Sequence, residues 1–325
     1  MTELTFRESV ARALAEELER DDRVLVLGED VGAAGGVFQA TAGLFDRFGP
    51  RRIRDTPISE QAIVGCALGA SVTGLRPVAE IMFADFAGVC FDQIANQLAK
   101  YRYMTGGQTT VPVTIRMANG GGVGFAAQHS QAVENWFLNV PGLKICVPGT
   151  PADAYGLLKA AIRDDNPVLV FEHKRLYSER GQVPDHDGVV ELGEADVVRT
   201  GSDLTVVATQ LMRQRALAAA EVLAAEGIDV EVVDPRTLVP LDLETIVGSV
   251  AKTGRLVCVQ ECPPTGSWGA TVVAAVVEQA WESLDIRPRL VSGDETPIPY
   301  AGSLEDAWLP SVDRIVAELR DLVTE

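Results

Sequence analysis

The 325-residue sequence predicts an α/β protein with two doubly wound α/β domains, each built on a mostly parallel sheet. Two observations lead to this prediction. Short apolar runs typical of strands buried on both faces alternate with segments that carry helix start and stop signals. The chain is also long enough for about two domains that each bury a core.

The N-terminal part begins with a helix and a buried strand. Thr5 and Glu8 have the spacing of a capping box, which predicts an amphipathic helix after Thr5. The run RVLVLGED predicts a buried strand, and GAAGGVF predicts a loop behind it. Because the glycines here lack the spacing G-x-G-x-x-G, they do not favour a dinucleotide site.

A further helix and strand are predicted near the middle of the chain. Thr150, Pro151 and Asp153 have the pattern of a helix start, so a helix is expected to run to about Arg163. The run PVLVFEH then predicts another buried strand.

The domain boundary is expected in a polar stretch. Between Tyr177 and Asp203 the sequence is rich in Gly, Pro and Asp, which is typical of a linker. We place the boundary near Asp187, which gives domains 1–187 and 188–325.

The C-terminal part repeats the alternation. LTVVAT, DVEVVD and RLVCVQE predict strands, and helices are expected over Met212–Glu226, Asp242–Ala251 and Trp268–Leu284. Right-handed crossovers between parallel strands follow from this order. The last helix is nearly apolar over ATVVAAVV, which predicts burial against a sheet or a partner chain.

Charge and composition exclude several classes of function. The formal net charge is −18, and no basic stripe is present, so a nucleic-acid partner is not expected. No apolar run reaches the ~18 residues of a membrane span, and the N-terminus does not have the pattern of a signal peptide. We therefore expect a soluble, cytoplasmic protein.

The cysteine pattern agrees with a reducing compartment. The five cysteines are scattered and lie mostly in apolar runs. Cys258 and Cys262 form a C-x-x-x-C, but no second Cys or His pair stands near enough to complete a zinc site. We interpret both as structural.

Glu60 stands out because it opens a long, nearly uncharged segment, DTPISEQ followed by AIVGCALGASVTGL. With Pro57 fixing the approach and Ser59 available as a cap, Glu60 would lie in the first turn of a helix, where the macrodipole favours a carboxylate. The residues alone leave two interpretations open, a capping carboxylate and a catalytic one.

His129 follows a glycine-dense stretch, GGGVGFAAQHSQ, residues 120–131. So many glycines mark backbone that adopts unusual dihedral angles or approaches a ligand closely. Gln128 and Ser130 could orient the imidazole for acid–base chemistry. A loop histidine satisfied by backbone carbonyls is the equally open alternative.

The stretch AEIMFADFAGVCFDQI, residues 79–94, is apolar but interrupted by three acidic residues. Met82, Phe83 and Phe86 could wall a flat heterocycle. Taken alone, such side chains are more often simply part of the core.

Taken together, these motifs resemble the β subunits of thiamine-diphosphate-dependent 2-oxo acid dehydrogenases. The resemblance rests on LGEDVG…GGVF, DTPISEQ, EIMFADF, FDQIANQLAKYRYMTGGQ, VPVTIR, AAQHSQ, PGLKICVP, LLKAAIRDDNPVLVFEHKRLY and KTGRLVCVQE, in order over nearly the whole chain. It is strongest to the acetoin and pyruvate branches. The implied fold is a transketolase-like pyrimidine-binding domain followed by a transketolase C-terminal-like domain.

The resemblance implies a role for Glu60. In the family, the glutamate of this motif hydrogen-bonds a nitrogen of the cofactor's aminopyrimidine ring. Burial disfavours the charged form of a carboxyl group, so Glu60 would share a proton with the ring and favour its imino tautomer. The imine would then take the thiazolium proton, which gives the carbanion that attacks the substrate carbonyl.

The other site residues follow from the same resemblance. His129 is implied in protonation steps and in transfer of the acyl group to lipoamide. Met82 and Phe86 would face the pyrimidine or the substrate, Ile58 would lie near the ring, and Glu29 would support the site from behind. Other branches have Gln and Tyr where this chain has Met82 and Phe86, which disfavours a branched-chain substrate.

A structural potassium ion is also implied. The positions that resemble its site are Val113, Ala161, Ile162, Asp164 and Asn166, which would offer mainly backbone carbonyl oxygens at a helix C-terminus. The alternative is that Asp164 and Asn166 only cap the end of the helix.

The partners are implied by what the chain lacks. The Gly-Asp-Gly motif that holds Mg²⁺ and the diphosphate is absent, so an α subunit would supply that half of the cofactor site in an α₂β₂ heterotetramer. The second domain would pair with another copy of this chain and dock a lipoyl acyltransferase core.

The expected function is therefore the β subunit of a pyruvate-type 2-oxo acid or acetoin dehydrogenase, an oxidoreductase component that passes its acyl group to lipoamide. Two alternatives stay open. One is a two-subunit carboligase or transketolase-like enzyme with the same cofactor and an aldehyde acceptor. The other is a non-catalytic stabilising subunit.

Overall fold

The computed structural model describes residues 1–325, which form two compact units. Unit 1 comprises Met1–Asn119 and Trp136–Leu192, and unit 2 comprises Gly120–Asn135 and Gly193–Glu325. The expected domain boundary near Asp187 stays a prediction. The loop Gly120–Asn135 belongs to unit 2 although the chain on both sides of it belongs to unit 1.

Unit 1 is built on a parallel sheet with the strand order β6-β7-β5-β4-β2-β3. A small antiparallel pair, β1 with β8, lies apart from it. The strands are β1 (Thr2–Thr5), β2 (Val24–Gly28), β3 (Ile53–Asp55), β4 (Arg76–Ile81), β5 (Thr114–Asn119), β6 (Lys144–Cys146), β7 (Val168–His173) and β8 (Arg180–Val183). The helices are α1 (Phe6–Arg20), α2 (Leu44–Phe48), α3 (Glu60–Val72), α4 (Ala99–Met104) and α5 (Pro151–Arg163).

Short helical turns complete unit 1. They are the 3₁₀ turns η1 (Ala84–Gly88) and η4 (Lys174–Leu176) and the π-helical turn η2 (Gln93–Leu98). A further 3₁₀ turn, η3 (Glu134–Phe137), lies where the chain passes from unit 2 back to unit 1.

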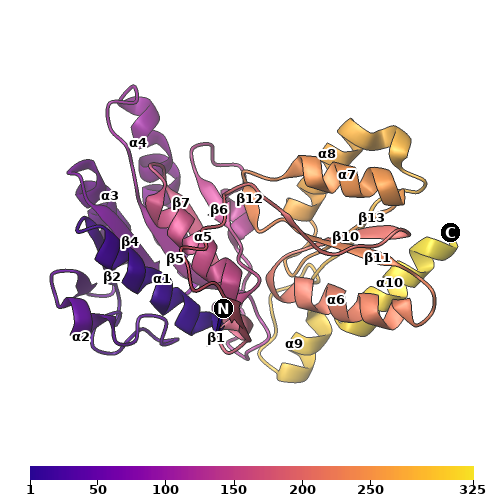
Figure 1. The fold of residues 1–325 in the computed structure, drawn as a ribbon, viewed down its shortest axis with the longest axis horizontal. Coiled ribbons are helices and arrows are strands. Elements are labelled where there is room, and N and C mark those ends of the chain that lie inside the picture. The colour runs from indigo at the N-terminus through magenta and orange to yellow at the C-terminus, as the bar shows by residue number, and fades with distance from the viewer. The chain divides into compact units, whose positions relative to one another are not determined.

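Helices cover both faces of the unit 1 sheet. Val24 and Val26 of β2 share a core with α1 and α5, which pack against each other (Figure 1). Leu25 and Leu27 point to the other face, because successive side chains of a strand alternate. On that face α3 packs on β4 and β2. This arrangement confirms the doubly wound architecture.

Unit 2 contains a second sheet, with the order β14-β13-β10-β11-β9, in which only the edge strand β9 is antiparallel. The strands of this sheet are β9 (Asp196–Arg199), β10 (Leu204–Ala208), β11 (Val230–Asp234), β13 (Leu256–Val259) and β14 (Arg289–Val291). The short strand β12 (Thr237–Val239) is not part of it. The helices are α6 (Gln210–Ala224), α7 (Leu243–Thr253), α8 (Trp268–Ala280), the 3₁₀ turn η5 (Trp281–Ser283), α9 (Gly302–Trp308) and α10 (Val312–Thr324). Helices α6 and α10 pack together on one face of this sheet, and α7 and α8 on the other (Figure 1).

The helix caps predicted at Thr5 and Thr150 are confirmed. The Thr5 hydroxyl accepts from Glu8 N, and Glu8 accepts from Thr5 N in return, which is a complete capping box. Thr150 accepts from Asp153 N at 3.1 Å at the start of α5. The predicted helix over Trp268–Leu284 is shorter in the structure, because α8 ends at Ala280 and a 3₁₀ turn follows.

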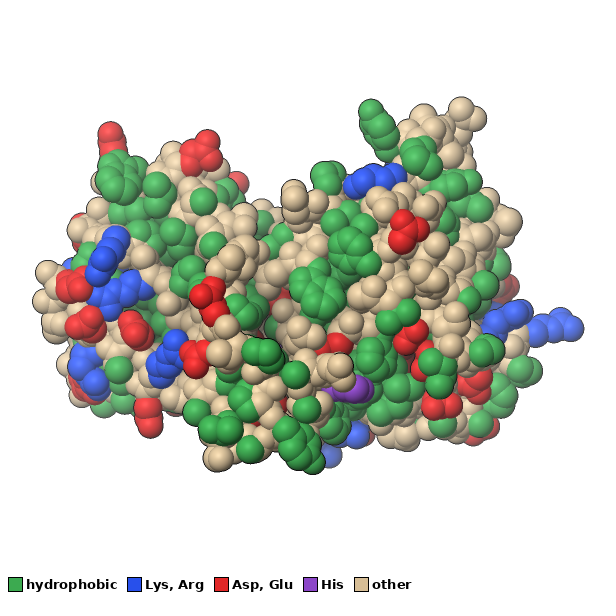
Figure 2. Space-filling view, turned by 180° about the vertical axis from the view of Figure 1, so that it is seen from behind, with side chains coloured by type: hydrophobic (Ala, Val, Ile, Leu, Met, Phe, Trp, Pro, Cys, Tyr) green, Lys and Arg blue, Asp and Glu red, His purple; other side chains and the backbone are tan.

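None of the helices is both long and apolar enough to cross a membrane. On the face seen in Figure 2, the Lys and Arg side chains form small groups, most of them beside Asp or Glu. No continuous basic stripe runs across that face.

A buried ion-pair network joins three central strands of unit 1. Arg116 of β5 donates to Glu80 of β4 at 2.6 Å and forms two bonds of 2.7 Å with Glu172 of β7. Tyr177 Oη donates to Glu172 at 2.9 Å. Burial raises the pKa of Glu80, and Arg116 opposes that rise. Burial would lower the pKa of Arg116, but Glu172 and Glu80 together raise it. Arg116 therefore places a positive charge between the two buried carboxyl groups of the sheet.

Arg116→Met should destabilise the chain strongly, because it leaves Glu80 and Glu172 buried without a cation. Removing one partner of a buried pair costs about 3–5 kcal/mol. The free energy of unfolding, measured by urea titration, should fall by about that much. The matched control is Arg47→Met, which removes a surface pair with Glu19 and should cost less than about 1 kcal/mol. Equal losses in the two variants would contradict this account of the core.

Candidate functional site

The carboxyl ends of β2, β3 and β4 form the edge at which most predicted site residues lie. These strands are parallel neighbours, and Gly28 at the end of β2 is in register with Asp55 and Glu80. Glu29 follows β2 directly, and Glu60 begins α3 after β3. Ligands of open parallel sheets bind outside this edge.

Glu60 is the first residue of α3, and its side chain is only 7% exposed. The expected cap from Ser59 is wrong, because the Ser59 side chain makes no capping hydrogen bond. Only the Ser59 carbonyl takes part, accepting from Ile63 N at 2.9 Å. Glu60 lies in the first turn of α3, where the helix macrodipole favours a carboxylate.

Glu29 and Glu60 lie close enough to influence each other. Burial raises the pKa of Glu29, and the negative charge of Glu60 raises it further. Neither carboxyl group has an ion pair with Lys, Arg or His. A buried carboxyl group that has a second carboxylate nearby and no cation beside it is typical of acid–base sites.

Cys90 lies beside this pair. Burial, followed by the negative charge of Glu60, raises the pKa of the Cys90 thiol to about 12. The thiol therefore stays protonated near neutral pH and adds an apolar surface to the pair.

Aromatic side chains stand next to the same edge. Phe86 of η1 lies edge-on to Phe83, with ring centroids 5.5 Å apart, and Phe83 contacts Phe38 at 5.6 Å. Met82 is half-buried and lines a small cavity with Phe38, Glu80 and Arg116. Ile58 is 84% exposed, so its side chain is free to contact a ligand or a partner chain.

The structure does not bring every predicted residue into this group. Glu29, Ile58, Glu60, Met82 and Phe86 all belong to unit 1. His129 is half-buried in the loop Gly120–Asn135 and belongs to unit 2, where its amide donates to Ala126 O at 3.4 Å.

The predicted potassium site lies around the C-terminal end of α5, where Arg76 already supplies a positive charge. Its guanidinium donates to Ile162 O at 2.9 Å and to Asp164 O at 2.7 Å. The Asp164 carboxylate caps the turn instead, accepting from Asn166 N at 2.8 Å, and it also binds Lys144. At two of the five predicted positions, Ile162 and Asp164, the carbonyl oxygen therefore binds the Arg76 guanidinium.

Sequence reasoning missed two sets of residues that support these positions. Arg116, Glu172 and Tyr177 are charged or polar side chains inside segments that the sequence predicts as buried strand or loop. A charged residue within a predicted buried strand was the signal that could have identified the network. Glu261 and Glu305 are both buried and accept hydrogen bonds from the glycine loop before His129. Both are far from that loop in sequence, and no local pattern links them to it.

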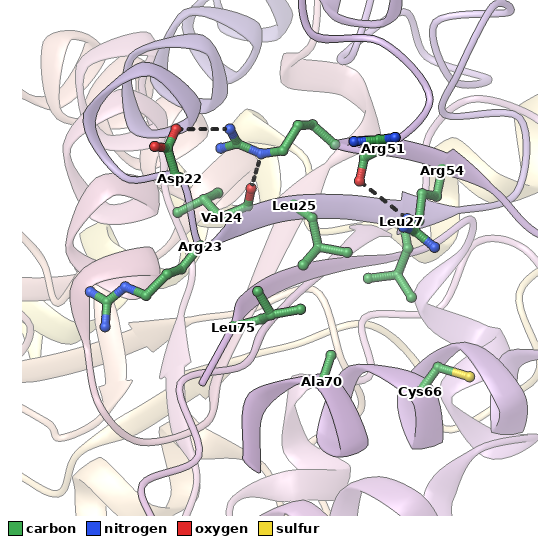
Figure 3. A pocket seen from close by; sticks show the side chains of 11 residues that line it. Asp22, Arg23, Val24, Leu25, Leu27, Arg51, Arg54, Cys66, Ala70 and Leu75 are labelled. Atoms are coloured by element: carbon green, nitrogen blue, oxygen red, sulfur yellow. Dashed lines mark hydrogen bonds and ion pairs between the residues drawn. The ribbon is translucent and has the colours of Figure 1, made fainter. Parts of the chain in front are cut away.

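A pocket of about 400 Å³ lies near the amino ends of β2 and β3, between these strands and α3 (Figure 3). Leu25, Leu27 and Ala70 form its apolar wall. Arg52, at its rim, is held by Val24 O at 2.6 Å and by two further carbonyls. None of the predicted site residues lines this pocket, so it is separate from the candidate site.

Across residues 1–325, no three His, Cys, Asp or Glu side chains gather as a metal site would require. Cys258 and Cys262 are both buried, and burial raises the pKa of each.

Comparisons with known proteins find relatives over nearly the whole chain. Residues 2–180 match the family described as transketolase, pyrimidine binding domain, and residues 193–315 match transketolase, C-terminal domain. The β subunit of acetoin:2,6-dichlorophenolindophenol oxidoreductase from Cupriavidus necator is 46% identical, over 98% of this chain and 96% of its own length. The 2-oxoisovalerate dehydrogenase subunit β of Bacillus subtilis is 46% identical over 99% of both chains.

Two further relatives widen the comparison. The pyruvate dehydrogenase E1 component subunit β of Rhizobium meliloti is 44% identical over 97% of this chain and 69% of its own length. Among solved structures, a chain described as a split gene transketolase, inactive beta4 tetramer, matches with a TM-score of 0.80. It has 28% identity and covers 99% of this chain and 98% of its own.

Thiol labelling tests the environment described for Cys90. Cys66 on α3 is exposed, whereas the other four cysteines are buried. Alkylation of the folded chain with iodoacetamide at pH 8, read by mass spectrometry, should therefore modify Cys66 alone, because thiolate is the reactive form. The denatured chain should take five adducts. Modification of Cys90 at a rate similar to that of Cys66 would overturn the buried carboxyl–thiol arrangement.

Proposed function

This chain belongs to the family of β subunits of thiamine-diphosphate-dependent 2-oxo acid and acetoin dehydrogenases, and from that premise we propose that it is the β subunit of such an enzyme component. Relatives named for acetoin, 2-oxoisovalerate and pyruvate are 46%, 46% and 44% identical to it. Because these values are so close, we propose a short-chain 2-oxo acid or acetoin as the substrate.

The single observation that carries the proposal is the buried pair of Glu60 and Glu29 at the carboxyl edge of the unit 1 sheet. Glu60 is 7% exposed, lacks a cation and raises the pKa of Glu29. An aminopyrimidine fits such a site, since its ring nitrogen can share the proton of a carboxyl group. Thr56 Oγ1 is a further buried polar atom without a partner, next to β3.

We assign the side chains as follows. Thiamine diphosphate, when bound, supplies the carbon nucleophile that cleaves the bond beside the substrate carbonyl. Glu60 holds a proton at a pyrimidine nitrogen. Glu29 has a raised pKa, so it stays protonated to a higher pH than an exposed Glu and places less negative charge beside Glu60. Phe86 and Met82 present apolar surface to the ring or the substrate, and Ile58 covers it from the exposed side. His129 assists transfer of the acyl group to a lipoyl acceptor.

We further propose that the cofactor site is completed by an α subunit. The sequence has no Gly-Asp-Gly motif for Mg²⁺ and the diphosphate, so those groups belong on the partner. Four relatives or neighbours are described as β chains, and the neighbour solved as a β tetramer is described as inactive. We propose that the two kinds of chain assemble as an α₂β₂ heterotetramer.

Unit 2 offers a surface for the other partners. Helix α8 buries Val272 and Val276, while Ala274 on the opposite side is exposed and Trp281 after it is 67% exposed. We propose that this exposed side of α8 pairs with a second copy of the chain, and that unit 2 docks a lipoyl acyltransferase core.

The five unpaired cysteines support a reducing, cytoplasmic location as part of the same proposal. The potassium ion stays a prediction. Two of the carbonyl oxygens proposed as its ligands, Ile162 O and Asp164 O, already accept hydrogen bonds from Arg76.

A second candidate function is a two-subunit transketolase-like carboligase. The solved neighbour named as a split gene transketolase favours it. The dehydrogenase subunits are much more similar, at 46% against 28% identity, so the dehydrogenase function stands first.

Glu60→Gln should abolish turnover of the assembled complex, by about 100-fold or more, because an amide cannot exchange a proton with the ring. Turnover is measured with an artificial electron acceptor, and assembly with the α subunit is checked by size-exclusion chromatography. Glu244→Gln is the matched control, since Glu244 also stands in the first turn of a helix but is exposed. An active, assembled Glu60→Gln complex would refute the mechanism.

His129→Ala should slow acyl transfer to a lipoyl acceptor more than the steps before it. The ratio of turnover with lipoamide to turnover with dichlorophenolindophenol should fall by about tenfold or more, since general acid–base catalysis contributes at least ~10²-fold. Equal losses with both acceptors would assign His129 to an earlier step or to structure.

A further inference from the structure

The loop that carries His129 is held by two buried carboxylates from distant parts of unit 2. Glu305 of α9 is 2% exposed and Glu261, which follows β13, is 7% exposed. Glu305 Oε1 accepts from Gly122 N at 2.8 Å, and its Oε2 accepts from Gly124 N at 2.9 Å. Glu261 Oε1 accepts from Gly121 N. Three backbone donors of one short stretch thus point at two carboxylates.

The glycines are what makes this geometry possible. Gly122 has a φ of +80° and Gly124 has a φ of +76°, a backbone region that other residues rarely adopt. Successive amides in such a turn form a nest that binds an anion. A Cβ on Gly121 would lie 3.2 Å from Glu261 Oε1 and 3.4 Å from Glu305 Oε1, which is tight. The anion in this nest is the protein's own carboxylate.

Further bonds close the loop around these contacts. Gly120 N donates to Gln131 O at 3.2 Å, which joins the two sides of the loop on either side of His129. Trp268 N, at the start of α8, donates to Asn135 Oδ1 at 2.7 Å near the end of the loop. The segment is therefore tied at its start and its end to unit 2.

We propose that Glu261 and Glu305 are positioning residues for His129, acting by ordering the backbone of Gly120–Asn135. A glycine-rich loop loses much conformational entropy on ordering, so strong bonds are needed to hold it. Hydrogen bonds to a buried carboxylate are among the stronger ones available. The role rests on the proposed function of His129 and extends it to two residues whose carboxylates accept hydrogen bonds from the loop backbone.

The chemistry of Glu305 makes the proposal specific. A carboxylate has two acceptor oxygens and can accept from Gly122 and Gly124 together. The amide of Gln offers one acceptor, and its NH₂ group would face a backbone N–H. Glu305→Gln preserves size and removes one of the two bonds. Asp306→Asn is the matched control, because Asp306 is the next residue on α9 and is exposed.

The first measurement is hydrogen–deuterium exchange on the α–β complex, followed at residues 120–131. Glu305→Gln should speed exchange there by about tenfold, as expected for loss of a hydrogen bond to a charged group, with Asp306→Asn unchanged. Exchange in β10 and β11 should stay at the wild-type level. Unchanged exchange in the loop of the Glu305→Gln complex would overturn the proposal whatever the enzyme's function.

The second measurement separates positioning from a general loss of structure. Glu305→Gln and Glu261→Gln should lower the ratio of lipoamide to dichlorophenolindophenol turnover, in the direction of His129→Ala, while Asp306→Asn keeps the wild-type ratio. A more mobile loop with an unchanged ratio, in a protein where His129→Ala does lower it, would refute positioning and leave the proposed function intact. No change of ratio in His129→Ala itself would refute the role of His129 and this inference with it.

Discussion

The parallel register of β2, β3 and β4 is the constraint on which the candidate site depends. It sets Gly28, Asp55 and Glu80 side by side, so the segments that follow β2 and β3 leave the sheet at one edge. Glu29 and Glu60 meet there although 30 residues separate them in the sequence. A slip of one residue would turn Glu80 to the opposite face of the sheet and away from Arg116. The same pairing thus fixes both the site and the charge network beside it.

The buried carboxylates of the chain fall into two kinds, those with a hydrogen-bond or ion-pair partner and those without one. Glu80 and Glu172 are paired with Arg116, and Glu305 is satisfied by backbone amides. Glu29 and Glu60 are also buried but have neither an ion pair nor such a bond. Burial without a partner is costly unless the group binds something else or holds a proton. That contrast, more than the presence of any single residue, points to the carboxyl edge as the place of chemistry.

The sequence was a good guide to the elements and a poor guide to contacts across them. Thr5 with Glu8 and Thr150 with Pro151 predicted the starts of α1 and α5 because capping is local. The Glu60 motif likewise identified the start of α3, though Ser59 does not cap it. By contrast, no local pattern shows that Arg76 donates to carbonyls at the end of α5. Nor does one show that Glu261 and Glu305 hold the glycine loop, because these contacts depend on how distant segments pack.

The central claim is that this chain holds one half of a thiamine diphosphate site and needs an α subunit for the other half. Calorimetric titration of thiamine diphosphate with Mg²⁺ tests it most directly, first on this chain alone and then on the chain co-expressed with its α subunit. The account predicts no measurable binding to the chain alone and tight binding to the complex. Tight binding to the chain alone would contradict it, since a diphosphate site would then exist within these 325 residues.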